Sequence, residues 1–345
     1  MSPPRSLAIA LLVCLAAAAE DAGSLRRQGR YAEAEAVLRQ ALQDRPEDAQ
    51  LLLDLGAVLF LQSRLPDAED VLKRSLALQE TVPALATLAR LHQVAERPAE
   101  AEVVLLRVIA LREAPDELQE LARFYLRQER WAVAEPRLRR ALELLETQYG
   151  PDHQSLLPPL DILAAVCQKL QRPTEAEALF HRALALRESQ FGPMHQDVAT
   201  TLDSLGALIY DQRRYPEAEA LYARSLGIWI LLLGADHPLM ASHFESLAAA
   251  LAGQGKLAEA EQQYRKALAI REAGVVRNGH NVALLLEAQG KPREAAALYR
   301  SHQPLLERLP ADSSLRKAVK VAAERVSGPR GGGRAGGSRK PGPGR

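Results

Sequence analysis

Three histidines at a constant spacing are the residues of this sequence that most resemble a metal-binding set. His153, His195 and His237 lie 42 residues apart, in the related segments YGPDHQS, FGPMHQD and LGADHPL. If each belongs to one repeating unit, adjacent histidines are about 10 Å apart, the usual spacing between packed helices. Because zinc binds its ligands at about 2 Å, we interpret these histidines as structural loop residues rather than as a metal site.

The repeated carboxylates also indicate structure rather than catalysis. Glu33, Glu175, Glu217 and Glu259 each lie in the first turn of an expected helix, where the helix dipole favours acids. The sequence contains no HExxH, GxSxG or paired CxxC motif, and GQGKLAEA lacks the first glycine and the Ser/Thr of a Walker loop. We therefore predict that the protein is not an enzyme and has no cofactor or metal.

The two cysteines offer no disulfide framework. Cys14 lies in an apolar run near the N-terminus, so its removal with a signal peptide would leave Cys167 alone. Cys167 falls at a core-facing position of ILAAVCQKL, which predicts a buried structural thiol rather than a nucleophile.

An internal repeat determines the elements that hold these residues. Segments such as GRYAEAEAVLRQAL (29–42) and RRYPEAEALYARSL (213–226) share a marker alanine. Successive markers are separated by 34, 33, 33, 42, 42, 42 and 35 residues, periods that are typical of a solenoid rather than of independent domains. The markers are Ala34, Ala68, Ala101, Ala134, Ala176, Ala218, Ala260 and Ala295.

Each unit is predicted to form two antiparallel amphipathic helices. In the sixth unit, apolar residues at helical spacing form one stripe before the polar turn DQRRYP and another after it. Gly206 and Ala218 are expected where the two helices approach most closely. Tyr222 is expected to fill the wider gap, and the small Ser225 to admit the helix of the next unit. Such hairpins must stack on neighbours to cover their apolar faces.

This pattern resembles the tetratricopeptide repeat, whose signature has small residues at positions 8, 20 and 27 and a large residue at position 24. The matching residues include Gly56, Ala68, Leu72 and Ser75; Ala122, Ala134, Leu138 and Ala141; and Ala248, Ala260, Tyr264 and Ala267. The resemblance implies an all-α fold, a right-handed α-solenoid of about eight helix-turn-helix repeats with a C-terminal capping helix. The expected repeats are 15–48, 49–81, 82–114, 115–156, 157–198, 199–240, 241–275 and 276–309, within a solenoid over 20–309.

The 42-residue units are additionally similar to the repeats of kinesin light chains. Their extra residues predict a longer second helix that ends at Gly150, Gly192 or Gly234, since glycine tolerates the positive φ of a helix stop. Asp152 and Asp236 are expected to cap the helices that follow.

The N-terminus predicts export. MSPPR precedes the apolar run SLAIALLVCLAAAA, the layout of a signal peptide over residues 1–19, and so a periplasmic or secreted protein. The run is short for a bilayer span, so no membrane span is expected in the mature chain. A lipoprotein anchored at Cys14 and a cytoplasmic protein whose first helix begins near Leu15 are the alternatives.

The C-terminus is expected to contain two different segments. Residues 310–326 include SSLRKAVKVAAERV, whose helical periodicity predicts a capping helix over the last repeat. Residues 327–345 have five basic residues, no acid and eight glycines, a composition typical of a disordered basic tail.

The resemblance further implies that the first helices of the repeats line a concave groove that binds peptides or extended protein segments. The arginines of the third and fourth repeats could bind carboxylates of such a ligand through paired hydrogen bonds. The acids of the fifth to seventh repeats could accept hydrogen bonds from its N–H groups or basic side chains. The alternative is that these charges only keep the groove hydrated. The expected groove residues are Asp54, Phe60, Arg90, Gln119, Arg123, Arg127, Asp161, Lys169, Asp203, Tyr210 and Glu245.

The sequence differs from the repeat proteins it resembles at positions that would determine ligand specificity. Kinesin light chain repeats usually place asparagines where this chain has LDIL, LDSL and FESL, and the lysine–asparagine clamp of some chaperone-binding relatives is missing. Neither cargo specificity is therefore transferred to this protein.

Two classes of function follow. The first is a non-catalytic interaction scaffold that binds a peptide or protein segment in the groove. The alternative is a nucleic-acid-associated adaptor that uses the basic tail. The formal net charge is only +1, and five tail charges without aromatic residues could supply only non-specific, salt-sensitive affinity, so specific nucleic-acid binding is not expected. Deletion of residues 327–345 would separate the two.

Overall fold

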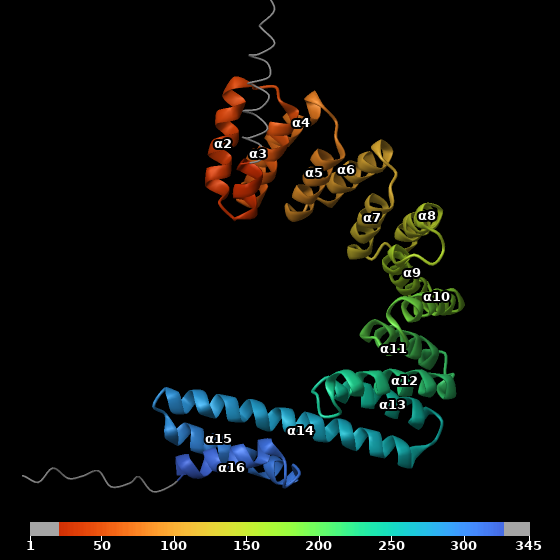
Figure 1. Cartoon of the computed structure of the whole chain (residues 1–345), viewed down its shortest axis with the longest axis vertical. Helices are drawn as coiled ribbons and strands as arrows, with labels where there is room; N and C mark the ends of the chain where they lie inside the picture. Colours follow the sequence, from red (N-terminus) through yellow and green to blue (C-terminus); the bar gives the residue numbers. More distant parts are fainter. Residues whose placement is uncertain (1–20, 328–345) are drawn as a thin grey trace, which may run out of the picture. The chain divides into compact units, whose positions relative to one another are not determined.

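The computed structural model describes residues 21–327, and in this range the chain is a succession of α-helices with one short 3₁₀ helix (Figure 1). The chain divides into two compact units, the first ending at Leu186 and the second beginning at Arg187. Each unit is described by itself. The predicted signal peptide (1–19) and all but the first residue of the predicted basic tail lie outside the described residues.

The first unit consists of helical hairpins that follow one another along the chain. Residues 21–27 are helical and precede the first complete element. Between residues 49 and 149 the two helices of each hairpin pack together, and between residues 31 and 169 the second helix of one hairpin packs on the first helix of the next. The elements are α2 (Tyr31–Asp44), α3 (Ala49–Leu61), α4 (Leu65–Leu78), α5 (Val82–Val94), α6 (Pro98–Leu111), α7 (Pro115–Arg127), α8 (Trp131–Tyr149), η1 (Gln154–Leu156), α9 (Leu157–Lys169) and α10 (Pro173–Phe191), whose last residues belong to the second unit.

The second unit continues the same pattern. Its helix pairs α11–α12, α13–α14 and α14–α15 each pack together, and α12 packs on α13. The helix α16 lies against α15 and α14, in the segment where a capping helix is expected. The elements are α11 (Gln196–Asp211), α12 (Tyr215–Leu233), α13 (Met240–Gly253), α14 (Leu257–Ala288), α15 (Pro292–Arg308) and α16 (Ser314–Ser327).

This arrangement confirms the predicted all-α solenoid of stacked hairpins. The marker alanines are buried throughout; Ala68, Ala134 and Ala218, for example, are inaccessible to solvent. Among residues 21–327, no helix combines the length and the apolar character needed to cross a membrane.

The turns inside the hairpins share one backbone geometry. The residue two positions before each second helix has a positive φ, whether it is glycine, as at Gly29 and Gly255, or not, as at Ser63, Glu129 and Arg213. In most hairpins a basic residue follows it directly and precedes the helix. The turn therefore fixes where that basic side chain leaves the backbone.

The close contact inside the sixth hairpin differs in detail from the prediction. The nearest atoms to Gly206 belong to the ring of Tyr222, not to Ala218, and a Cβ added at Gly206 would lie 2.8 Å from Tyr222 Cε1. Ser225 is buried, and its hydroxyl donates to the carbonyl of Ala199, 3.1 Å away in the first helix of the same hairpin. Both small residues thus serve the hairpin itself.

The inserted segments of the longer repeats end their second helices at glycine, as predicted. Gly150, Gly192 and Gly234 have φ between 81° and 88°. The elements that follow have His153 and Leu239 at their N-cap positions, near which Asp152 and Asp236 were expected to cap.

Each inserted histidine accepts a hydrogen bond from the backbone N–H two residues later. The Nδ1 atoms of His153, His195 and His237 lie 3.2, 3.1 and 3.3 Å from these nitrogens. The imidazoles of His153 and His195 also stack on Tyr149 and Phe191. These contacts support the interpretation of the histidines as loop residues.

The junction of the seventh and eighth repeats departs from the predicted pattern. The expected boundary between residues 275 and 276 lies inside the single helix α14, which runs from Leu257 to Ala288. The segment EAGVVRNGHNVALL contains neither a proline nor the inserted loop that ends the second helix in the preceding repeats. The second helix of the seventh repeat therefore continues directly into the first helix of the eighth.

Candidate peptide-binding surface

Two arginines on the first helices of the first unit have no carboxylate partner. Arg90 of α5 is exposed, and its guanidinium carbon lies 5.8 Å from the centre of the Phe60 ring on α3. Arg127 of α7 is exposed and donates to the side-chain oxygen of Gln93 on α5, at 2.6 Å. Within residues 21–327, neither guanidinium forms an ion pair, so both can bind a carboxylate from another molecule.

The other predicted residues of α7 are less available. Arg123 is partly exposed and donates to Glu120 of its own helix at 2.5 Å, an exposed pair of small energetic value. Gln119 is buried, and its amide lies 3.3 Å from the carbonyl oxygen of Pro115, one turn earlier. Gln119 is therefore more enclosed than a groove residue is expected to be.

The remaining predicted residues of the first unit lie on α3 and α9. Asp54 is partly buried, accepts from the Gln50 amide at 3.1 Å, and has a pKa raised above its ordinary value chiefly by burial. Lys169 is exposed, with its ammonium 6.0 Å from the centre of the Trp131 ring. Asp161 is partly buried on the same helix as Lys169.

In the second unit, Asp203 already has partners from two other helices. The indole N–H of Trp229 on α12 donates to its carboxylate at 3.0 Å, and His243 Nδ1 of α13 lies 3.3 Å from the same oxygen. The rings of Trp229 and His243 stack with their centres 5.3 Å apart. A ligand would have to compete with this cluster for the carboxylate.

Glu245 is similarly occupied. Its two carboxylate oxygens accept from Arg271 of α14 at 2.7 and 2.6 Å, in the paired geometry that guanidinium groups favour. Tyr210, at the end of α11, lies against Tyr215 with ring centres 5.3 Å apart. The polar groups of this unit are thus used mostly within the chain.

Three contact residues were not among those predicted from the sequence. Gln93 lies 33 residues after Phe60, at the same position of the repeat, so the repeat phase itself indicates it. Trp229 lies 26 residues after Asp203, and Arg271 lies 26 residues after Glu245. The same separation joins Ser225 to Ala199, so it is a regular contact between the two helices of a hairpin.

A ladder of ion pairs joins consecutive repeats on the second helices. In each pair, the basic residue before a second helix contacts the glutamate that follows the marker alanine of the preceding repeat. We call this set the inter-repeat ladder. Its pairs are Arg64–Glu35 (2.9 Å), Arg97–Glu69 (2.5 Å), Arg130–Glu102 (2.6 Å), Arg172–Glu135 (2.7 Å) and Lys256–Glu219 (2.7 Å).

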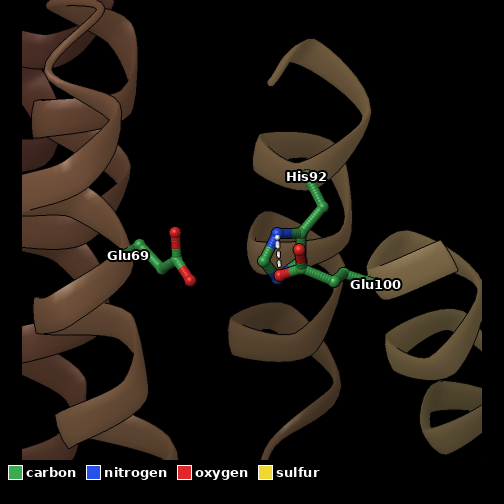
Figure 2. A group of neighbouring side chains, drawn as sticks. All are labelled: Glu69, His92 and Glu100. Atoms are coloured by element: carbon green, nitrogen blue, oxygen red, sulfur yellow. Dashed lines mark ion pairs between the residues drawn. The ribbon is translucent and has the colours of Figure 1, made fainter. Parts of the chain in front are cut away.

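One cluster has the residue types of a metal site. Glu69 of α4, His92 of α5 and Glu100 of α6 offer ligand atoms that all lie within 4.8 Å of one another (Figure 2). His92 is buried, its Nδ1 atom has no hydrogen-bond partner, and the nearest carboxylate oxygen belongs to Glu100 at 3.4 Å. Burial, with the positive charge of Arg97, lowers the pKa of His92.

The charges of this cluster are already balanced by protein cations. Arg97 contacts both carboxylates, Glu69 at 2.5 Å and Glu100 at 3.1 Å, and Lys73 contacts Glu69 at 2.6 Å. A divalent ion would have to displace these groups or lie beside a guanidinium at close range, which Coulomb repulsion opposes. We therefore assign the cluster to the inter-repeat ladder rather than to a metal centre.

The thiol of Cys167 is placed as predicted. It is fully buried in α9, and burial raises its pKa above the ordinary value. A reactive cysteine needs the opposite, an accessible thiolate with a lowered pKa.

Sequence and structure comparisons agree on the type of repeat. Two family models described as the tetratricopeptide repeat match the chain, one over residues 117–189, 155–210 and 197–273, the other over residues 15–83. Together they cover more than half of the sequence. No curated protein matches it.

Solved structures with a similar fold come from several organisms. The C-terminal part of a TPR repeat-containing protein from Cytophaga hutchinsonii has a TM-score of 0.54 and 13% identity, over 73% of this chain and 95% of that one. BtubC from P. vanneervenii has a TM-score of 0.48 and 20% identity, over 72% and 91%. A putative kinesin light chain repeat protein from Podospora anserina has a TM-score of 0.48 and 22% identity, over 55% and 94%. At these identities the likeness concerns the fold alone.

Proposed function

The chain belongs to the tetratricopeptide-repeat family, and on that premise we propose that it is a non-catalytic scaffold that binds an extended acidic protein segment across α5 and α7. The observation that supports this most is the exposure of Arg90 and Arg127 without carboxylate partners, on consecutive first helices. The two predicted carboxylates on first helices of the second unit, Asp203 and Glu245, are by contrast already bound within the chain.

The contacts of the two arginines prepare them for a ligand. Phe60 supports one face of the Arg90 guanidinium, and Gln93 accepts from one nitrogen of Arg127, so the remaining N–H groups of each can donate outward. A guanidinium fork fits a carboxylate with two parallel hydrogen bonds. A planar group held in place also loses less entropy on binding than a free side chain does.

The spacing of the helices predicts the spacing of acids in the ligand. The Arg127–Gln93 hydrogen bond brings α7 beside α5. Neighbouring helices are about 10 Å apart, and an extended segment advances roughly 3.3 Å per residue. Two carboxylates about three residues apart, one of which could be a chain terminus, would therefore reach the arginines of α5 and α7 together.

Charge reversal tests this proposal. Fluorescein-labelled extended peptides with and without glutamates at this spacing would be titrated with the protein, and binding followed by anisotropy. Arg90→Glu with Arg127→Glu should weaken binding of the acidic peptide at least about tenfold, since each charged hydrogen bond contributes about 1.5–3 kcal/mol. Helical content should not change, because both side chains are exposed.

A charge-matched variant provides the control. Arg74→Glu with Arg300→Glu makes the same change in net charge at two exposed positions on α4 and α15 and should leave binding intact, as should deletion of residues 328–345. Equal loss in both double variants would show that only net charge matters, and undiminished binding by the Arg90/Arg127 variant would refute the site.

We also propose that this function is exercised outside the cytoplasm. The support is the predicted signal peptide over residues 1–19, with its basic start, apolar run and small residues before Glu20. N-terminal sequencing of the mature chain should begin at Glu20. A chain that retains Met1 in the soluble fraction of the cell would contradict this location.

A further inference from the structure

The long helix α14 exposes a straight line of apolar side chains. Leu257, Tyr264, Leu268, Val275 and Val282 are each between 44 and 68% exposed. Their separations of seven, four, seven and seven residues keep them within about 20° of one line along a helix that turns about 100° per residue. We call this set the α14 stripe. It extends over roughly 38 Å at the usual rise of 1.5 Å per residue.

The stripe is exposed because two helices of the solenoid are fused into one here. In the sixth repeat, Tyr222 and Leu226 of α12 are each 7% exposed, and α13 packs on that helix. The equivalent residues of the seventh repeat are Tyr264 and Leu268, which are 44 and 53% exposed. The helix that would cover them is absent, since α14 continues straight to Ala288.

Two faces of α14 that flank the stripe are already covered. Ala260 and Ala267 are buried in its N-terminal half, which packs on α13. Val276 and Ala283 are buried in its C-terminal half, where α15 and α16 pack (Figure 1). The stripe lies between these two covered faces, and a shallow depression of about 350 Å³ beside Leu257, Tyr264 and Leu268 marks its N-terminal half.

We propose that the α14 stripe is the interface of a homodimer, in which two copies of α14 pack antiparallel across a twofold axis. Seven- and four-residue separations are those of a coiled-coil seam. A twofold axis near residues 269 and 270 aligns four of the five stripe residues with one another. In that register Leu257 lies opposite Val282 of the partner subunit, and Tyr264 lies opposite Val275 of the partner subunit.

The polar residues beside the stripe also match in this register. Glu261 lies opposite Asn278 of the partner subunit, where a hydrogen bond can form between them. Arg271 lies beside Leu268 of the partner subunit, and its charge is compensated by Glu245 at 2.6 Å, so its alkyl stem can cover the leucine.

Charge along one flank favours the same orientation. Arg265 and Glu272 lie on the same side of the stripe, nearly equidistant from the twofold axis, so an antiparallel partner brings opposite charges together twice. Each has a partner within its own chain, Glu261 and Arg308 respectively, and the intermolecular pairs would extend these contacts. A twofold contact requires a surface that is complementary to itself, and the stripe has this property.

Light scattering coupled to size-exclusion chromatography tests the dimer with the full chain. The wild-type protein should be dimeric at micromolar concentration. Leu268→Glu with Val275→Glu should be monomeric with unchanged helical content by circular dichroism, because both side chains are at the surface. The control, Leu231→Glu with Val321→Glu, introduces the same charges at exposed apolar positions outside the stripe and should remain dimeric.

Engineered cysteines test the orientation. With Cys14→Ser and Cys167→Ala as background, Tyr264→Cys with Val275→Cys should form an intermolecular disulfide on mild oxidation, whereas either cysteine alone should not. A monomeric wild-type chain would overturn the proposal and would indicate that the stripe binds a helix of another protein. Dimers that persist in the Leu268/Val275 variant, or a disulfide formed by Tyr264→Cys alone, would also overturn it.

Discussion

Gly206 illustrates how the size of one residue sets the distance between the helices of a hairpin. Its nearest neighbour is the ring of Tyr222, which is itself almost completely buried. Gly56 has the same relation to Leu72, whose Cγ atom would lie 2.7 Å from an added Cβ. At this position of the repeat, a glycine therefore pairs with a large residue sixteen positions later.

Replacing Gly206 by alanine should destabilise the protein, although alanine is the better helix former. The helix propensity gain is about 1 kcal/mol, but the added methyl group would lie 2.8 Å from the largely buried Tyr222 ring, and overpacking typically costs about 1–3 kcal/mol. We expect a net loss of about 1 kcal/mol in urea denaturation monitored by circular dichroism.

Gly227→Ala is the matched control, because Gly227 lies inside α12 with nothing within 4 Å of an added Cβ. It should stabilise the protein by up to about 1 kcal/mol, the propensity difference alone. Equal effects of the two substitutions would show that the Gly206–Tyr222 contact does not limit packing.

At the scale of elements, the inter-repeat ladder joins each second helix to the turn that precedes the second helix of the following repeat. Glu69 is one of its two most enclosed acids, with a side chain that is 12% exposed and in contact with both Arg97 and Lys73. The hydrogen bond from Arg97 is the largest cause of its lowered pKa, about 2. The carboxylate is therefore more acidic in the folded chain than in the unfolded one.

Glu69→Gln should lower the free energy of unfolding at neutral pH, by an amount of the order of 1–3 kcal/mol. Because the folded pKa lies below the unfolded value of 4.5, the stabilisation is complete above pH 4.5 and is lost as the pH falls toward 2. The difference between wild type and variant should shrink over that window in urea titrations at a series of pH values.

Glu33→Gln serves as the comparison, since Glu33 pairs with Arg30 at a fully exposed site. It should leave the stability unchanged at every pH. A wild-type-minus-variant difference for Glu69 that does not vary between pH 5 and pH 2 would contradict the assignment of its pKa.

The helical hairpins were predictable from the sequence because the marker residues face the core at every repeat. Ala68, Ala134 and Ala218 are completely buried, so a small residue recurs at this position and the repeat can be recognised in the sequence. The continuous helix α14 was missed because the prediction extended the repeat from Ala260 to Ala295 without requiring a stop signal between them. Glycines such as Gly274 are tolerated inside a helix at a cost of about 1 kcal/mol.

The candidate site was predictable only in part. The repeat phase placed Arg90 and Arg127 on first helices, and both are exposed there. The phase does not reveal which charges are compensated from another helix: Asp203 binds Trp229, and Glu245 binds Arg271, each 26 residues later. These pairs depend on side-chain reach across the hairpin, which a single helix pattern does not contain.

For the whole molecule, the free energy of unfolding is expected to be a sum of local contributions from the repeats and their interfaces. Helices pack almost entirely on their neighbours along the chain, as in other repeat proteins, where stability is close to a sum of repeat and interface terms. The C-terminal end depends on α16, whose Val319 and Ala322 share a buried cluster with Tyr299, Leu306 and Leu309.

Removal of α16 should therefore loosen the last repeat and leave distant repeats intact. A chain ending at Pro310 exposes the apolar face of α15, and amide hydrogen exchange should accelerate in α15 and in the C-terminal part of α14. Exchange in α3 to α8 should be unaffected, because α16 packs on α15 and α14. Deletion of residues 328–345 alone should change neither region. Faster exchange throughout α3 to α8 in the shorter chain would instead show that the repeats unfold as one cooperative unit.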